Sequence, residues 1–201
     1  NQSGQVSRLL LVLAIIVLVA VVITYLILKM AERPPAPTPE PTDNTVPLPV
    51  YQETLGNIKF VFMSSLDLGS ALRASEAKGQ QSSWLKDVAT TERFIIVTIG
   101  AQNKGKENIS ENSWDIGDIV DSEGRKFVSL DSYSSDPWIP DESSCKALLK
   151  PEFDPLPCTK IYEVSKISTG LKITVITGKN NDSGKFSSGD VDQALIDLII
   201  K

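Results

Sequence analysis

Hydrophobic residues are distributed very unevenly along the chain, and the first apolar run is the longest. Leu9–Leu28 is 20 residues long, carries no charge and contains one non-apolar residue, Thr24. An α-helix of this length spans roughly 30 Å, the thickness of the hydrocarbon core of a bilayer. Arg8 and Lys29 bound the run closely. The pattern predicts a transmembrane helix over residues 9–30 that contacts the lipid bilayer through Leu9–Leu28.

A proline-rich segment follows this run. Seven prolines lie between residues 34 and 49, separated mainly by Ala, Thr, Glu and Asp. This composition favours an extended polyproline-II chain without internal hydrogen bonds. We therefore divide the N-terminal part into a polar segment over residues 1–8, the helix over 9–30 and a Pro-rich linker over 31–55.

From residue 56 the pattern changes to short alternating runs separated by turn residues, which is typical of β-strands. The last run is also compatible with a helix, but its alternation favours a strand. Apolar residues on both faces of the second run indicate a central strand. The seven strands are expected at Asn57–Met63, Arg93–Asn103, Trp114–Val120, Arg125–Leu130, Cys158–Ser165, Leu171–Thr177 and Asp192–Lys201.

Seven strands with turns between them predict an all-β domain over residues 56–201, an immunoglobulin-like antiparallel β-sandwich. The segment is longer than a minimal sandwich, and two insertions, Leu66–Thr91 and Asp131–Pro157, account for the excess. A helix is expected in the first insertion over Ser70–Lys78, with Ser70 as its N-cap.

The composition excludes several classes of catalytic site. The chain has no histidine and two cysteines among its 201 residues, so Ser-His-Asp catalysis, imidazole ligands and a four-thiolate metal site are excluded. After residue 33 there are 17 basic and 24 acidic residues, a net charge of −7, with no basic cluster suited to nucleic acid. We expect no cofactor and no nucleic-acid partner.

One part of the chain resembles a known family. Arg93–Ile99 runs into Gln102-Asn103-Lys104-Gly105-Lys106-Glu107, and the turn Asp121–Gly124 follows, with Leu149-Lys150-Pro151-Glu152 and Ile161-Tyr162-Glu163-Val164 after it. Over roughly residues 58–198 these motifs resemble the telokin-like, immunoglobulin-like extracytoplasmic domains of domain-of-unknown-function family 4352. The resemblance implies a non-catalytic sandwich behind an N-terminal anchor and a low-complexity linker. Glu152, where the family usually has glycine, and the long second insertion depart from the family pattern.

The two cysteines, Cys145 and Cys158, lie 13 positions apart. A redox or metal pair would need a CxxC spacing or a histidine, and the chain has neither, so a disulfide that closes a proline-containing loop is favoured. Closing a loop of this size contributes about 3 kcal/mol in the chain-entropy treatment. Trp138 and Phe153 lie in or beside this loop, where they form either a partner-contact surface or a cover for the sandwich edge.

Four acidic residues gather around one turn. Asp115, Asp118, Asp121 and Glu123 form a candidate Ca²⁺ site by composition. The EF-hand spacing is absent, so solvated charges on a hairpin are the favoured interpretation and no metal is expected.

A loose Ser-x-x-Lys spacing occurs twice, at Ser83–Lys86 and Ser143–Lys146. The spacing arises readily by chance, and the Ser-Asp-Asn and Lys-Thr-Gly motifs that accompany it in Ser/Lys acyl enzymes are missing. We do not expect an enzyme.

These features lead to one functional hypothesis and one alternative. The hypothesis is a non-catalytic, single-pass membrane protein whose C-terminal domain faces outward at the cell surface and binds an unknown protein or cell-envelope partner. Arg8 precedes the helix and Lys29 and Arg33 follow it, so the flanking charges do not decide the orientation. The acidic C-terminal part and the cysteine pair favour the outward one. The alternative is a structural subunit of a pilin-like filament or membrane complex, self-assembled through the apolar helix, although Gln5 stands where type IV pilins carry glutamate.

Overall fold

The computed structural model describes residues 18–19, 21–26, 29, 48–78, 85–178 and 191–201. The chain divides into two compact units, Asn1–Pro47 and Leu48–Lys201. In the first unit the described residues are helical and exposed. The remainder of the apolar run, the polar segment over 1–8 and the linker up to residue 47 lie outside the described residues. Among the described residues, no helix combines the length and the apolar character that crossing a bilayer requires.

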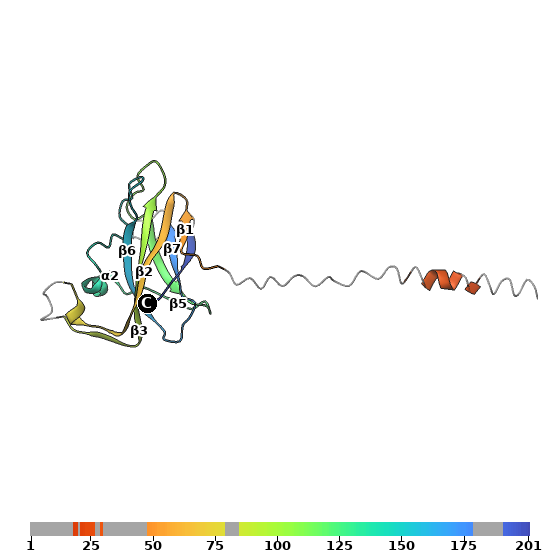
Figure 1. Ribbon diagram of the computed structural model, residues 1–201, viewed down its shortest axis with the longest axis horizontal. Helices are drawn as coiled ribbons and strands as arrows, with labels where there is room; N and C mark the ends of the chain where they lie inside the picture. Colours follow the sequence, from red (N-terminus) through yellow and green to blue (C-terminus); the bar gives the residue numbers. More distant parts are fainter. Residues whose placement is uncertain (1–17, 20, 27–28, 30–47, 79–84, 179–190) are drawn as a thin grey trace, which may run out of the picture. The chain divides into compact units, whose positions relative to one another are not determined.

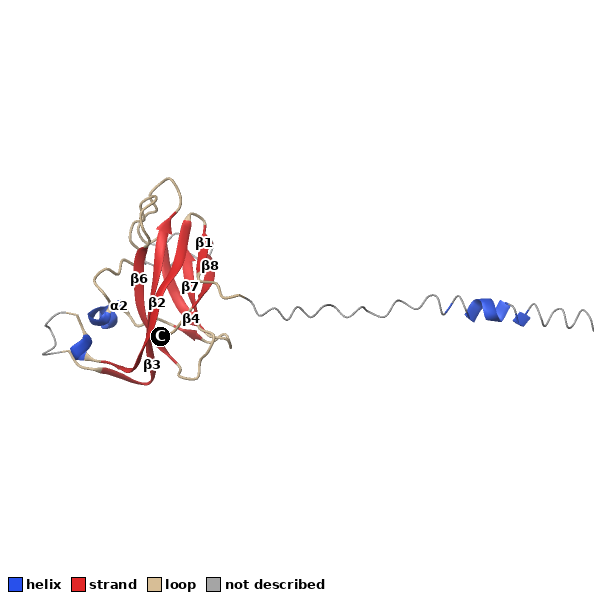
Figure 2. Ribbon diagram, in the orientation of Figure 1, coloured by secondary structure: helices blue, strands red, loops and turns tan. Residues whose placement is uncertain are grey.

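The described part of the second unit forms two four-stranded antiparallel sheets (Figures 1 and 2). One sheet has the order β1-β2-β3-β6 and the other β5-β4-β7-β8. The strands are β1 (Gln52–Leu55), β2 (Ile58–Leu72), β3 (Val88–Asn103), β4 (Trp114–Val120), β5 (Lys126–Phe127), β6 (Leu156–Val164), β7 (Lys172–Thr177) and β8 (Asp192–Asp197). The expected all-β sandwich is therefore confirmed.

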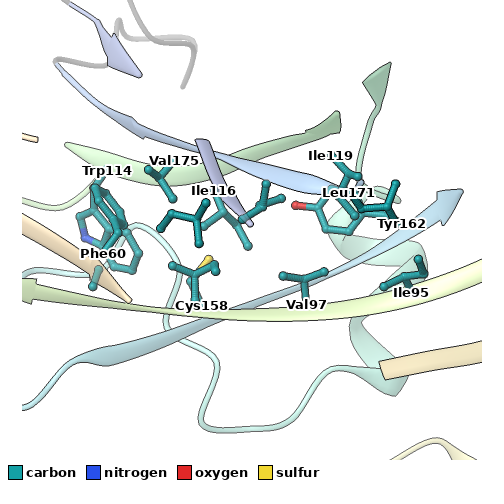
Figure 3. Close-up of a cluster of buried hydrophobic side chains, with 14 of the residues drawn as sticks. Phe60, Ile95, Val97, Trp114, Ile116, Ile119, Cys158, Tyr162, Leu171 and Val175 are labelled. Carbon is teal, nitrogen blue, oxygen red and sulfur yellow. The ribbon is translucent and has the colours of Figure 1, made fainter. Parts of the chain in front are cut away.

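The main core lies between the two sheets (Figure 3). Alternate residues of β3 enter it, because successive side chains of a strand point to opposite faces. Phe60 of β2 meets Trp114 of β4 at a ring-centroid distance of 6.3 Å. Tyr162 is also buried in this core, and its hydroxyl donates to the carbonyl oxygen of Gly117 at 2.7 Å.

A second, smaller core covers the outer face of the first sheet. Leu72, Phe94 and Ile161 form its buried centre, and Trp138 packs against them. Short helical segments of the second insertion supply this cover: α2 (Ser132–Ser135) and the 3₁₀ turn η2 (Asp136–Trp138). The apolar character of β3 on both faces is thus explained, and its predicted central position, between β2 and β6, is confirmed.

The helix expected over Ser70–Lys78 is wrong. Ser70 lies in β2, which continues to Leu72 and pairs with β3 through Ala71–Ala89 and Leu72–Val88. Only the 3₁₀ turn η1 (Ala74–Glu76) is helical there. Cross-strand hydrogen bonds override the weak local preference for helix, so the first expected insertion begins as an extension of the β2–β3 hairpin.

Two further differences and one agreement concern the strands. β1 was not expected and forms by pairing with β2. The strand expected over Arg125–Leu130 is reduced to β5, because the chain then turns to the other sheet, where the backbone N–H of Leu130 donates to the carbonyl of Ile161 at 2.8 Å. The final run is a strand, β8, as its alternation predicts.

Candidate functional site

The predicted disulfide between Cys145 and Cys158 is present, with Cα atoms 4.4 Å apart. Cys158 belongs to β6, lies opposite Ile99 of β3 in the register and is fully buried in the main core. Cys145 belongs to the preceding loop and is partly buried against that core. The disulfide therefore attaches the loop covalently to an inner position of the first sheet.

Hydrogen bonds reinforce this attachment. The indole Nε1 of Trp114 donates to the carbonyl of Ala147 at 2.7 Å. The backbone N–H of Ser144 donates to the carbonyl of Pro157 at 2.7 Å, and the hydroxyl of Ser143 accepts from the N–H of Thr159 at 2.9 Å. The loop thus lies along the outer edge of β6 at a defined position.

A buried carboxylate lies beside the disulfide. Asp115 forms ion pairs with Lys160 at 2.9 Å and with Lys146 at 3.5 Å, and its side chain is only 9% exposed. One of its oxygens and the two sulfur atoms lie within 4.8 Å of one another. Both sulfurs are bonded to each other, so neither is a thiolate available to a metal.

The four acidic residues of the candidate Ca²⁺ site are not brought to one point. Asp115 lies near the start of β4 and Asp121 directly follows its last residue, roughly 20 Å away at the rise of a strand. Asp118 lies between them, half-buried, and Glu123 pairs instead with Arg125 at 3.1 Å. Asp115 and Asp121 each have basic partners of their own, which favours the interpretation as structural charges.

Asp121 organises its turn. Its carboxylate accepts hydrogen bonds from Arg125 Nε at 2.6 Å, from the hydroxyl of Ser168 at 2.8 Å and from two backbone N–H groups of the turn. Burial acts to raise the pKa of Asp121, but these hydrogen bonds, led by that of Arg125, outweigh it and lower the pKa to about 2. Gly124 closes the turn with φ of +80°.

The two aromatic candidates lie in different places. Trp138 is half-buried on the second core, and its Nε1 donates to the carbonyl of Arg73 at 2.8 Å, so it covers the sheet. Phe153 is 59% exposed, and the ammonium of Lys150 lies 5.3 Å from its ring centroid. It borders a small, mainly apolar pocket of about 210 Å³. Trp138 packs against the cluster that contains Phe94 of β3, whereas the carbonyl of Phe153 accepts from the side chain of Gln102, near the other end of that strand. The two aromatic residues therefore do not form one surface.

A larger groove lies beside the disulfide. Its volume is about 600 Å³, and it runs between β6 and the segment that contains α2 and η2. Hydroxyl side chains line much of it, Leu130, Ile139 and Pro140 provide apolar surface, and Cys145 forms part of its wall. Its charged residues are Lys78, Asp131, Asp136, Asp141, Lys146 and Lys160.

Sequence reasoning missed this groove. Lys78 and Asp136 are 58 positions apart, and their contact depends on the β2–β3 hairpin reaching η2, where the backbone N–H of Lys78 donates to the carbonyl of Pro137 at 2.7 Å. A hydrogen bond with Asp141 raises the pKa of Lys78, against an opposing effect of burial. No local sequence motif predicts such a long-range pairing.

The second Ser-x-x-Lys motif does not form a nucleophile–base pair. The hydroxyl of Ser143 bonds with the backbone of Thr159, and the ammonium of Lys146 pairs with Asp115. In the first motif, Ser83 lies outside the described residues.

No protein-family model matches the chain, and no curated protein matches its sequence. Three solved structures are similar to it. A conserved hypothetical protein from Bacillus anthracis has 16% identity, covering 63% of this chain and 88% of that one, with a TM-score of 0.46. The yjhA protein from Bacillus subtilis has 13% identity, with 74% and 96% covered and a TM-score of 0.44. A functionally unknown protein from Listeria monocytogenes has 12% identity, with 75% and 82% covered and a TM-score of 0.44.

Proposed function

We propose that this chain is a non-catalytic, membrane-anchored interaction module whose β-sandwich faces the outside of the cell. The helix predicted over residues 9–30 holds the domain at the membrane, and the Pro-rich linker gives it reach. Tethering raises the effective concentration of the domain at the surface, so a weak partner contact is sufficient.

The observation that carries this proposal is the disulfide between Cys145 and Cys158, which attaches the groove-lining loop to β6. Disulfides persist in oxidising compartments and are rare in the cytosol. A covalently fixed loop on a rigid sandwich is also the arrangement in which binding residues are commonly placed.

The strand order supports the immunoglobulin-like part of the proposal. With β2, β3 and β6 taken as strands A, B and E, the first sheet has the order A-B-E, and β4, β7 and β8 then supply C, F and G in the second. Strand β5 takes the place of C′ beside C.

We also propose that the chain belongs to domain-of-unknown-function family 4352, and two of the motif segments that carry this resemblance contact each other. The side chain of Asn103, from the strand-end motif, donates to the carbonyl of Leu149, and the N–H of Glu152 donates to the carbonyl of Asn103 at 3.2 Å. The segments that carry the resemblance thus depend on each other for their conformation.

Surface labelling in intact cells tests the proposed orientation. One variant, Tyr133→Cys, places a thiol on the sandwich, where Tyr133 is 92% exposed. The matched variant, Ser3→Cys, places a thiol in the N-terminal segment. A membrane-impermeant maleimide should label Tyr133→Cys in intact cells and Ser3→Cys only after lysis, with the native disulfide chain as the unlabelled control. The reverse pattern would show that the domain faces the cytoplasm.

The alternative that we keep is a subunit of a pilin-like filament or membrane complex, assembled through the apolar run. The described part of the apolar run exposes large hydrophobic side chains, including Leu18 at 66% and Val21 at 62%, which lipid or other copies of the helix would cover. Size measurement of the full chain in mild detergent separates the two functions. A monomer at high concentration supports the anchored module, and helical fibres support the alternative.

A further inference from the structure

One wall of the groove beside the disulfide carries a surplus of negative charge. The ammonium of Lys78 pairs with both Asp136, at 3.4 Å, and Asp141, at 3.0 Å. Their carboxyl side chains are 70% and 85% exposed. Two carboxylates therefore share one cation, and both remain open to solvent.

Another part of the groove lining has the opposite imbalance. Lys146 and Lys160 share the single carboxylate of Asp115, which does not itself line the groove. The ammonium of Lys160 also donates to the carbonyl of Ile116 at 2.6 Å, which holds it toward the protein. Lys146, with a longer ion pair and a side chain 37% exposed, is the cation available to a ligand.

The side chains that line the groove carry no net charge, and Asp115 behind them makes the sum −1. Three lysines and three aspartates line it, but the two imbalances lie on different elements: the first on Lys78 and the η2 segment, the second on β6 and the disulfide loop. A simple anion would be attracted by Lys146 and repelled by the surplus carboxylates. A simple cation would be attracted by those carboxylates and repelled by Lys146. A neutral ligand would leave both imbalances unmatched.

We propose that this groove binds a short peptide with free termini, whose ammonium group lies at Asp136 and Asp141 and whose carboxylate lies at Lys146. The hydroxyl groups of the lining, such as those of Ser129 and Ser132, match the hydrogen-bonding groups of a peptide backbone. The apolar surface receives its side chains, and a volume of about 600 Å³ is in the range of small-ligand sites. This inference rests on the proposed function, because it specifies what the interaction module recognises.

The test is a calorimetric titration of the purified full chain, in mild detergent, with tri-alanine and its capped forms. Acetylation of the amino terminus and amidation of the carboxyl terminus should each weaken binding about tenfold, because each removes one charge-assisted contact. Alanine and di-alanine, as shorter probes, measure the charge separation that the groove prefers.

Variants connect each terminus to its wall. Lys146→Gln should weaken binding of free tri-alanine about tenfold yet have no further effect on the amidated peptide. The double variant Asp136→Asn with Asp141→Asn should also weaken binding of free tri-alanine about tenfold, and it should have no further effect on the acetylated peptide. Lys106→Gln and Glu111→Gln, at exposed positions that do not line the groove, serve as matched controls and should leave binding unchanged.

Several results would overturn the inference. They are the absence of binding by tri-alanine, equal binding of free and capped peptides by the native chain, or equal losses in groove and control variants. The comparison of free with capped peptides uses the native chain and so decides the matter even where a variant fails to fold. Failure here leaves the cell-labelling result intact, whereas peptide binding by a chain that labels as cytoplasmic would refute the proposed orientation alone.

Discussion

The side-chain amide nitrogen of Asn103 lies 3.0 Å from the carbonyl oxygen of Leu149, 46 positions further along the chain. The same nitrogen donates to the carbonyl of Glu107 at 2.7 Å, and the amide oxygen accepts from the N–H of Gly105 at 2.8 Å. Asn103 is 1% exposed, so water does not replace these partners readily. One amide thus holds together two loops at the end of the sandwich.

Replacing this amide with a side chain of similar size should destabilise the domain. In Asn103→Leu the carbonyl of Glu107 loses this donor, the N–H of Gly105 loses its acceptor, and the carbonyl of Leu149 keeps only the N–H of Ile109. We expect a cost of about 1–3 kcal/mol in the free energy of unfolding. Urea denaturation of the full chain in mild detergent, followed by tryptophan fluorescence, measures this cost. Asn108→Leu, at an exposed position, is the control, and equal stabilities of the two variants would contradict the role of Asn103.

Asp121 should make the stability depend on pH in the acid range. Its pKa is about 2 in the folded chain, below the ordinary 3.8, so its contribution is complete above pH ~4 and is lost as the pH falls towards 2. Asp121→Asn should therefore be less stable than the native chain at pH 7, and the difference should shrink between pH ~4 and ~2. Denaturation midpoints across this range give the measurement. Glu111→Gln, at an exposed position, should follow the native curve, and a pH-independent difference for Asp121→Asn would refute the assignment.

The disulfide should contribute to stability through the unfolded chain. It closes a loop with a sequence separation of 13, so reduction should lower the free energy of unfolding by about 3 kcal/mol. Urea denaturation with and without dithiothreitol measures the effect. The double variant Cys145→Ser with Cys158→Ala should match the reduced chain and should not respond to dithiothreitol. A native chain that is equally stable in both states would contradict this contribution.

Gly124 should tolerate few side chains. No atom lies within 4 Å of a Cβ placed there, so any cost arises from its φ of +80° and not from crowding. Gly124→Ala should cost about 1–2 kcal/mol. Gly124→Asn should cost less, because asparagine adopts the left-handed region more readily than alanine. Thermal unfolding of the two variants compares them, and equal losses would indicate that something other than backbone conformation limits this position.

Much of the fold follows from local pattern. Alternation placed β4 at its observed bounds and identified β8 as a strand, because a half-buried strand needs apolar residues at every second position. The two-sided apolar pattern of β3 also indicated its central place in a sheet. The disulfide could be deduced by elimination, since the chain has two cysteines, no CxxC spacing and no histidine.

Other features could not be read from local pattern. Ser70–Lys78 has helix-like signals, yet Ser70 forms part of a strand because β3 lies alongside it and offers hydrogen bonds. The candidate Ca²⁺ residues are close in sequence, but an extended strand separates Asp115 from Asp121. Short spacing brings residues together on a turn and separates them on a strand, and the choice between these depends on tertiary pairing.

The sequence by itself determined the all-β class, the main strands and the disulfide, because periodicity and composition act through neighbours along the chain. Only the tertiary structure decided that Trp138 covers a second core, that Lys78 meets Asp136 and Asp141, and that Lys146 meets Asp115. These contacts join segments distant in sequence, and their partners are selected by how the hairpin, the insertion and β6 pack. The groove and its two opposite charge imbalances therefore belong to the packed domain and to no single motif.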